Sequence, residues 1–385
     1  MTKLLNALTA DHEDMKAWRH HLHRHPEVAF DEHQTARYIA RLLRDWGYDV
    51  TEGIGRTGVV ASLTVGDGRK AIGLRADIDA LAVQETISSD YRSTVAGKSH
   101  TCGHDGHSAM LLGAAQYLAR EKCFNGTVHL IFQPAEEVMG GAPAMIADGL
   151  FERFPMDAVF GLHNMPTLER GKLYFTAGPV MAAVDNWEIV LTGVGSHGSM
   201  PERSIDPVVA GAALVMALQT IVSRNVAAKD SAVVTVGAFL AGDAGNVIPQ
   251  SATLRLSTRT SKPETRKLVL DRIRSITAAQ AAAFGVTYEI REGAPGAVLV
   301  NDPAQTEEVA QVARKVLGDE QVVMPGPTFM GSEDFAYYAQ RKPGTYAFIG
   351  NGDTPMVHHP MYDFDDRNLP VGAAYWVAIA QHYLK

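Results

Sequence analysis

The segment CGHDGHSAMLLGAAQYLAREKCFNGTVHLIFQPAEE, residues 102–137, joins a turn, a helix pattern and a strand pattern in one continuous stretch. Its glycines permit a tight turn before the helix pattern at residues 107–118, and the β-rich run 127–132 follows. Helix and strand patterns alternate in the same way around it. The flanking segments are a helix at 31–46 and β-rich runs at 59–65, 71–76 and 158–162. This alternation predicts an α/β fold with parallel strands in its sheet.

The pattern changes in the second half of the chain. Strand patterns at residues 186–192, 232–239 and 253–260 mix with two long helix patterns, near 206–224 and 265–284, which indicates a compact α+β unit. The α/β pattern resumes after residues 293–296, with a helix at 302–317, a strand at 345–349 and a helix at 369–384. We therefore predict an α/β domain, residues 1–183 and 293–385, with a mixed, largely parallel sheet flanked by helices. A smaller α+β domain, residues 184–292, interrupts it.

The composition argues against several classes of protein. Apolar residues make up 46% and charged residues 20% of the 385 residues, which is ordinary for a globular protein. The net charge of −8 argues against bulk electrostatic binding to nucleic acid or to an anionic membrane. Two cysteines, Cys102 and Cys123, cannot form a disulfide framework, and we expect a reducing, cytoplasmic location. The charge-free segment 207–223 lies at the short limit for a membrane span, and we predict a buried helix there.

Cysteine and histidine stand together in the turn that opens the quoted segment. Thiolate and imidazole are good ligands for zinc and related metals, so Cys102 and His104 are candidate metal ligands. Two other interpretations remain open for this turn. Cys102 is either a free cysteine in an ordinary turn or a nucleophile activated by a histidine that the fold brings near.

Two neighbouring carboxylates, Glu136 and Glu137, follow the β-rich run at the other end of the segment. Ligands gather at the ends of strands in α/β sheets, and adjacent carboxylates repel each other unless a cation or a proton intervenes. One of them can bind a metal while the other takes a proton from the water of that metal. The alternative is a solvated acidic loop.

Two further histidine positions fit the same chemistry. His163 ends the β-rich run 158–162, and His358 and His359 precede an acidic stretch. Each feature taken alone is also typical of an ordinary polar loop or of a histidine whose hydrogen-bonding groups are satisfied. Three of the four features lie beyond predicted strands or before a predicted helix, and cysteine, histidine and glutamate together are the usual ligands of a metal site.

In their order along the chain these segments resemble the metal-dependent aminoacylase and carboxypeptidase amidohydrolases. The resemblance is to the branch with hippurate hydrolase, bacterial N-acyl-amino-acid deacetylases and plant auxin-conjugate hydrolases, and it covers nearly the whole chain. Besides the segments already quoted, it rests on residues 23–27, 74–81, 195–201, 246–249 and 331–335, and on His358 with Pro360.

The resemblance implies a site for two divalent metal ions, zinc or manganese, with cobalt or nickel also compatible. Its matched ligands are Cys102, His104, Glu137, His163 and His358. Cys102 stands where relatives outside this branch have a bridging aspartate; His104 and His163 would complete one metal, and Glu137 and His358 the other. Glu136 matches the catalytic base. Asp77 matches an aspartate that orients a metal-ligand histidine elsewhere, although Arg75 replaces its usual partner.

The resemblance also assigns roles to the inserted domain, which matches a satellite domain that commonly makes dimers or higher homo-oligomers. His197 matches a residue that approaches the reacting carbonyl from a partner subunit, and Asn246 and Arg259 match positions that contact the substrate. The implied activity is hydrolysis of a small N-acyl-L-amino acid, hippurate-like or N-acetylated, to a carboxylic acid and an amino acid. The alternatives are a metallo-carboxypeptidase or dipeptidase on short peptides, a Cys102 thiol hydrolase, a structural metal protein and a non-catalytic ligand-binding relative.

Overall fold

The computed structural model describes residues 2–385, which divide into two compact units. Unit 1 holds the chain up to Gly178 together with Val300–Pro327 and Asp334–Lys385. Unit 2 holds Pro179–Leu299 and the short segment Thr328–Glu333. That short segment is a difference from the predicted boundaries, which leave it in the α/β domain. The chain passes between the units at β7 (Gly178–Met181), at β14 (Leu299–Asn301) and on either side of Thr328–Glu333.

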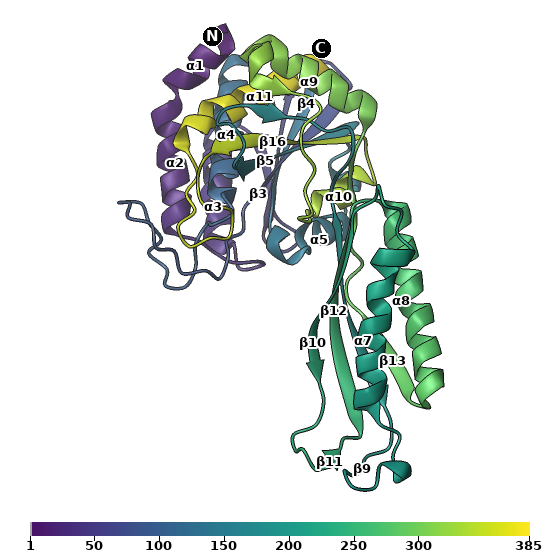
Figure 1. Ribbon diagram of the computed structural model, residues 1–385. Coiled ribbons are helices and arrows are strands. Elements are labelled where there is room, and N and C mark those ends of the chain that lie inside the picture. The colour runs from purple at the N-terminus through teal and green to yellow at the C-terminus, as the bar shows by residue number, and fades with distance from the viewer. Residues whose placement is uncertain (1) are drawn as a thin grey trace. The chain divides into compact units, whose positions relative to one another are not determined.

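Unit 1 is built on an eight-stranded mixed sheet in the order β1-β2-β4-β3-β5-β16-β6-β15. Figure 1 labels its strands β3, β4, β5 and β16. The four central strands, β4, β3, β5 and β16, run parallel to one another, whereas β1, β2 and β6 pair antiparallel with their inner neighbours. The strands are β1 (Asp49–Ile54), β2 (Gly58–Val65), β3 (Ala71–Asp77), β4 (Gly126–Gln133), β5 (Ala158–Pro166), β6 (Leu173–Tyr174), β15 (Val322–Val323) and β16 (Gly344–Gly352). The predicted fold class is confirmed.

Helices cover this sheet because its central strands are apolar on both faces. On β3, Ile72, Leu74 and Ala76 join the core beneath α4 and α11, while Gly73 lies against Met156 on the other face. The helices of unit 1 are α1 (Lys3–Ala10), α2 (His12–Arg24), α3 (His33–Asp45), α4 (His104–Glu121), α5 (Gly141–Ala147), α6 (Leu150–Arg153), α9 (Pro303–Leu317), α10 (Phe335–Ala339) and α11 (Leu369–Tyr383).

Parallel strands bring several chemically active segments to one edge of the sheet. β3 ends at Asp77 and β4 at Gln133, just before Glu136, and His163 lies in the second half of β5, three residues before its end. Because carboxyl ends of parallel strands share one edge, these side chains converge there, where α4 also begins at His104.

Unit 2 is a four-stranded antiparallel sheet in the order β10-β12-β8-β13, with helices α7 and α8 packed against it. Its strands are β8 (Ala183–Thr192), β10 (Ala232–Leu240), β12 (Ser251–Thr260) and β13 (Thr287–Glu292), and its helices are α7 (Pro207–Arg224) and α8 (Pro263–Phe284). Alternate residues of β8, Trp187, Ile189 and Leu191, face the helices and form the core of the unit. A two-stranded ribbon, β9 (Ser196–His197) with β11 (Val247–Ile248), lies at the end of unit 2 next to the start of β12 (Figure 1).

Helix α7 corrects the prediction of a buried helix at residues 207–223. Asp206 caps it by accepting from the N–H groups of Val208 and Val209, and Pro207 begins it. It is the one helix of the described residues that is long and apolar enough to cross a membrane, a test that ordinary core helices also meet, and a third of it is buried. Its other face is exposed and also apolar, with Val209 53% and Met216 71% exposed. Lack of charge therefore did not distinguish a buried helix from one with an apolar outer face.

Candidate metal centre

The centre begins at the turn before α4. Gly103 has φ +86°, a conformation that favours glycine, and it caps the helix whose first residue is His104. This turn buries Cys102 and brings its Sγ to 3.4 Å from Nε2 of His163 on β5. His163 donates from Nδ1 to the carbonyl oxygen of Asn164, so its Nε2 carries no proton when the ring is neutral. The two possible ligand atoms, Sγ of Cys102 and Nε2 of His163, therefore face each other inside the site.

His104 is oriented by Asp79, a residue without a role in the sequence-based site. The Nδ1 of His104 donates to Oδ1 of Asp79 over 3.1 Å, which leaves Nε2 as the ligand atom. That Nε2 is buried 3.9 Å from Oε1 of Glu137, and neither atom has a hydrogen-bond partner among the described residues. Buried polar atoms in proteins are nearly always satisfied, and a cation between these two would satisfy both.

The adjacent glutamates lie in a tight turn after β4. Ala135 and Met139 on either side have φ of +52° and +55°, and Glu136–Val138 forms one turn of 3-10 helix. Two buried carboxylates hold this turn: Glu32 accepts from the N–H of Ala135 over 2.9 Å, and Asp79 accepts from the N–H of Glu137 over 3.0 Å. Asp79 therefore holds both the imidazole of His104 and the backbone of Glu137.

The structure separates the two adjacent histidines near the C-terminus. His358 has φ +70°, and its N–H donates to the carbonyl oxygen of Thr101 over 2.7 Å. This backbone bond brings its Nε2 to 3.3 Å from Oε2 of Glu137. The Nδ1 of His359 instead accepts from the N–H of Met361 at the surface. Only His358 of the pair joins the candidate ligands.

Three of the compact ligand groups at this centre have their ligand atoms within 4.8 Å of one another. They are Cys102, His104 and His163; Cys102, Glu137 and His358; and His104, Glu136 and Glu137. The first two share Cys102 and divide the other four candidate ligands in the way the family resemblance implies. Thiolate, imidazole and carboxylate donors suit divalent transition metals, so the residues present fit such ions.

The electrostatics of the centre favour positive charge. Burial alone would lower the pKa of His104, but Asp77 and Asp79 outweigh it and raise that pKa to about 10. Burial would raise the pKa of Glu137, but the imidazoles of His358 and His104 lower it. For Cys102, burial and then the charges of Glu137 and Glu136 raise the pKa of the thiol well above its ordinary value. Without a cation the sulfur stays protonated, so Cys102 is poorly suited to act as a free nucleophile.

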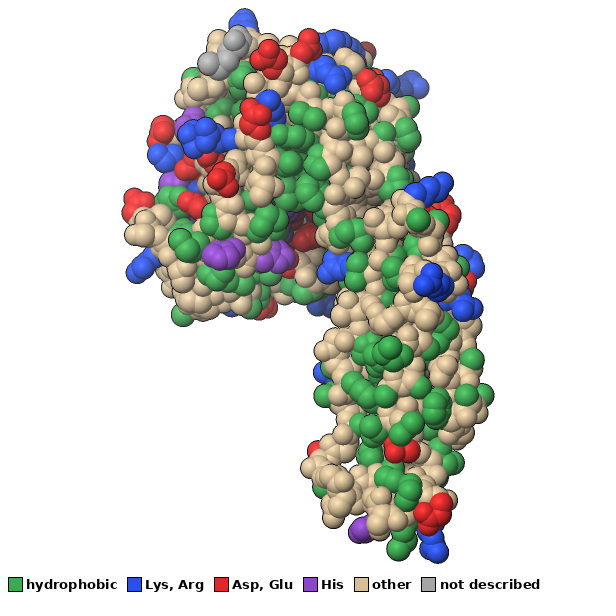
Figure 2. Space-filling view, in the orientation of Figure 1, with side chains coloured by type: hydrophobic (Ala, Val, Ile, Leu, Met, Phe, Trp, Pro, Cys, Tyr) green, Lys and Arg blue, Asp and Glu red, His purple; other side chains and the backbone are tan. Residues whose placement is uncertain are grey.

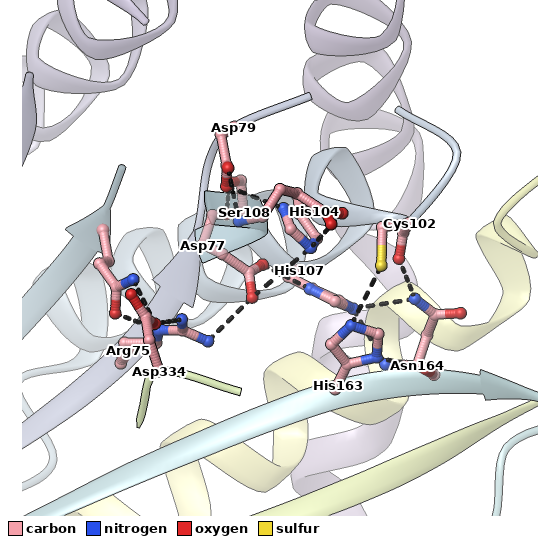
Figure 3. A network of polar contacts seen from close by, with 12 residues as sticks. Arg75, Asp77, Asp79, Cys102, His104, His107, Ser108, His163, Asn164 and Asp334 are labelled. Carbon is pink, nitrogen blue, oxygen red and sulfur yellow. Dashed lines mark hydrogen bonds and ion pairs between the residues drawn. The ribbon is translucent and has the colours of Figure 1, made fainter. Parts of the chain in front are cut away.

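Asp77 lies beneath the centre in a buried polar network (Figure 3). Its Oδ1 accepts from Nδ1 of His107 over 2.6 Å, and Arg75 joins its Oδ2 to Asp334. Asp79, not Asp77, holds the ring of His104, whose Nε2 is 3.8 Å from Asp77. The signal that could have indicated Asp79 is the alternation Asp77-Ile78-Asp79, which places two carboxylates just where β3 ends.

The three predicted substrate residues lie in unit 2 and do not come together within it. His197 pairs with Val247 in the small ribbon, and Asn246 precedes that ribbon and accepts from Gly198 through its carbonyl. Arg259 lies at the other end of β12 and donates to the carbonyl of Met330 and to Oγ of Ser332. At ~3.3 Å per residue, about 26 Å of strand lies between Ser251, beside the ribbon, and Arg259.

Comparison with known proteins shows which family the chain resembles. Residues 73–382 match the model of "Peptidase family M20/M25/M40". A hippurate hydrolase from Campylobacter jejuni is 44% identical over 367 residues, which cover 95% of this chain and 96% of that protein. An N-acetyl-L-cysteine deacetylase from Bacillus subtilis is 38% identical over 360 residues, covering 93% of this chain and 85% of that protein.

A solved structure agrees with these matches. The Bacillus subtilis YXEP protein, described as a dinuclear metal-binding peptidase of the M20 family, superposes with a TM-score of 0.86 at 33% identity. The superposition covers 98% of this chain and 99% of that one. The predicted resemblance, including its hippurate hydrolase and deacetylase branches, is confirmed. The chain belongs to peptidase family M20/M25/M40.

Proposed function

We propose that the chain is a metal-dependent amidohydrolase that cleaves N-acyl-L-amino acids to a carboxylic acid and a free amino acid. One observation carries the proposal: Glu136 is buried beside two groups of ligand atoms that share Cys102. A structural metal site is closed and needs no spare base, so a carboxylate at this place favours catalysis. The names of the relatives agree on the reaction, since hippurate and N-acetylcysteine are both N-acylated amino acids.

The proposed centre holds two divalent cations. Cys102 would bridge them, with His104 and His163 on one and Glu137 and His358 on the other. When bound, the cations supply Lewis-acid polarisation and lower the pKa of water towards neutrality. Zinc, manganese, cobalt and nickel all accept such donors.

The other residues of the chain take the remaining roles. Glu136 accepts the proton of the attacking water and delivers it to the leaving amine. Arg259 binds the free carboxylate of the amino acid, since its planar guanidinium matches that group. His197 stabilises the oxyanion that forms on the amide carbonyl, and Asn246 contacts the substrate.

We propose further that unit 2 forms a homodimer. Its strand β10 is at the edge of the sheet, with Leu240 51% exposed, and lies next to the apolar outer face of α7. Figure 2 shows hydrophobic side chains gathered along the face of unit 2 where α7 lies. A second copy would cover both the unpaired strand edge and the apolar face, which are otherwise aggregation-prone. A cytoplasmic location stays a prediction.

The first test compares the two adjacent glutamates, because the proposal gives them different roles. Glu136→Gln should keep both metals and lose most turnover, by ~10²–10⁴-fold or more, because an amide cannot accept a proton. Glu137→Gln should bind one metal more weakly, because a neutral amide replaces an anionic ligand, and added metal should partly restore its rate. Metal content and hydrolysis of hippurate, N-acetyl-amino acids and dipeptides are measured across a metal titration.

The same assay separates the alternatives. Turnover that survives exhaustive chelation would contradict a metal-dependent mechanism and favour a Cys102 nucleophile. Loss of metal by Glu136→Gln with only slower turnover by Glu137→Gln would show that the two roles are reversed. Faster hydrolysis of dipeptides than of N-acyl-amino acids would favour the peptidase alternative.

A further inference from the structure

Asn164 follows the candidate ligand His163 on β5, and each of its polar atoms is hydrogen-bonded. Its N–H donates to Nε2 of His107 over 2.9 Å, and its Nδ2 donates to the carbonyl of Cys102 over 2.7 Å and to the same Nε2 over 3.0 Å. Its Oδ1 accepts from the hydroxyl of Tyr362 over 2.6 Å, and its own carbonyl accepts from His163. The residue is 0% exposed.

These bonds connect three segments that carry candidate ligands. Figure 3 shows the amide of Asn164 pointing at the carbonyl of Cys102 while the ring of His163 lies beside it. Tyr362 belongs to the segment that follows His358. The one side chain of Asn164 therefore joins the turn of Cys102, strand β5 and the segment after His358.

The orientation of the amide is determined by its partners. His107 donates from Nδ1 to Asp77, so its Nε2 is an acceptor and requires a donor from Asn164. The carbonyl of Cys102 also requires a donor, whereas the hydroxyl of Tyr362 supplies one. A flipped amide would place its oxygen against two acceptors, so one orientation alone satisfies all three neighbours.

Gly103 makes room for this arrangement. A Cβ at Gly103 would overlap both Nδ2 of Asn164 and the hydroxyl of Tyr362, and the φ of +86° also disfavours any other residue. The glycine between Cys102 and His104 thus permits Asn164 and Tyr362 to approach the backbone of the turn directly.

We propose that Asn164 is a positioning residue whose side chain sets the orientation of Cys102 as a metal ligand. Its side-chain amide holds Cys102 through the backbone carbonyl of that residue, whereas the bond from Nδ1 of His163 ends on the main-chain carbonyl of Asn164, which every substitution keeps. This role rests on the proposed function, since it assumes that Cys102 binds metal. Partners that orient ligands typically change metal affinity or activity 10–100-fold when they are removed.

Cobalt(II) is the probe, because a thiolate bound to it gives a charge-transfer absorption that reports on Cys102 directly. The variants are Asn164→Ala, which removes all side-chain bonds, Asn164→Asp, which puts an acceptor against the carbonyl of Cys102, and Tyr362→Phe, which removes one hydroxyl. The matched control is Asn301→Ala. Asn301 is equally buried and its amide makes three bonds, to Thr176 and Tyr346, but it touches no candidate ligand.

We expect Asn164→Ala to bind cobalt ~10–100-fold more weakly and to lose or shift the thiolate band, with Asn164→Asp similar and Tyr362→Phe milder. Asn301→Ala should lower the melting temperature but keep the band and the affinity. If Asn164→Ala changes only the melting temperature, as the control does, the residue is merely structural and the proposal is wrong. If Asn164→Ala fails to fold, unchanged cobalt binding by Asn164→Asp and Tyr362→Phe overturns it.

Measurements on the wild-type chain distinguish a failure of the role of Asn164 from a failure of the proposed function. A wild type that hydrolyses N-acyl-amino acids and shows the thiolate band, alongside unaffected variants, overturns only the role of Asn164. A wild type with neither hydrolysis nor a thiolate band overturns the proposed function, and this role with it.

Discussion

A buried ion network at the scale of single residues supports the turn that carries Cys102 and His104. Arg19 on α2 is fully buried and pairs with Asp105, the second residue of α4, and with Asp363 and Asp366 after His358. His23, one helical turn further on, donates from both ring nitrogens, to Asp105 and to Glu85, each over 2.8 Å. A histidine that donates twice must be protonated. Asp105 and Glu85 are buried, and a buried carboxylate without a cationic partner is costly, so the network depends on both cations.

The network predicts a pH dependence of stability. Burial would lower the pKa of His23, but Asp105 outweighs it and raises that pKa to about 9. A folded-state pKa above the unfolded value of about 6.5 contributes stability that is complete below pH 6.5 and is lost as the pH rises through 9. The free energy of unfolding of the wild type should therefore fall relative to His23→Gln across this window, by at most about 3 kcal/mol.

Urea unfolding of both chains between pH 6 and 9.5 measures this difference. His33→Gln, an exposed change at the start of α3, is the control and should follow the wild type at every pH. A constant difference between wild type and His23→Gln across the whole range would mean that His23 does not change its charge there.

Single residues also show what could be predicted at the site. The five candidate ligands and Glu136 were proposed from the sequence because cysteine, histidine and glutamate are conspicuous at strand ends and helix starts, and the resemblance then assigned their roles. Asp79 and Asn164 were not given roles, because an aspartate or asparagine acquires its role from partners that only the fold supplies. The resemblance had already indicated His358 rather than His359, and the left-handed backbone at residue 358 is the feature that the sequence did not indicate.

At the scale of elements, most helices and strands followed their patterns to within a few residues, and the exceptions have physical causes. The predicted helix at residues 107–118 begins earlier, at His104, because Gly103 caps it in a left-handed conformation. The ribbon β9 with β11 was not predicted, because two-residue strands have no period to detect. Helix α7 was predicted as buried because its segment is apolar and carries no charge, yet it buries only the face that includes Leu214 and Leu218.

The exposed face of α7 gives a prediction about assembly. Met216 is 71% exposed, so Met216→Glu should change the stability of one protomer by ~0.5 kcal/mol or less. In a dimer that covers this face, an unpaired buried carboxylate costs about 3–5 kcal/mol, which weakens association more than a hundredfold. Sedimentation and light scattering across a dilution series measure this dissociation.

Leu268→Glu is the matched control, because Leu268 is an exposed apolar residue, 37% exposed, on the neighbouring helix α8. It should leave association unchanged. An unaltered dimer in Met216→Glu would mean that the dimer interface lies elsewhere, and a monomeric wild type would contradict dimerisation itself.

At the scale of the whole molecule, an α/β unit is interrupted by an α+β unit. The change of pattern near residue 184 made the interruption predictable. The short segment Thr328–Glu333, which belongs to unit 2, was not, because six residues without a period carry no signal of their own. Ser332 of that segment accepts from Arg259 and lies two residues before Asp334 of unit 1. Arg259 and Ser332 therefore bind each other within unit 2.

His197 and Asn246 stand at the opposite end of β12 from Arg259, so one chain does not gather all three residues in unit 2. A dimer would bring the three residues together if the ribbon of one chain, with its His197 and Asn246, contributes to the site of the other chain. Each site would then contain Glu136 and Arg259 from one chain and His197 and Asn246 from its partner. Complementation between inactive variants tests this division, because a symmetric dimer shares its residues reciprocally.

Mixing His197→Ala with Glu136→Gln should restore activity, because each heterodimer then has one site with both residues intact and one with neither. With random pairing, half of the dimers are mixed, so about a quarter of the wild-type rate is expected. Glu136→Gln mixed with Asn246→Ala should recover in the same way. Glu136→Gln mixed with Arg259→Ala should not recover, since every site then lacks one of two residues that act in the same chain.

Rates are measured on heterodimers verified by two different affinity tags. No recovery with His197→Ala would place that residue in the site of its own chain, and recovery with Arg259→Ala would place the arginine in the site of the partner.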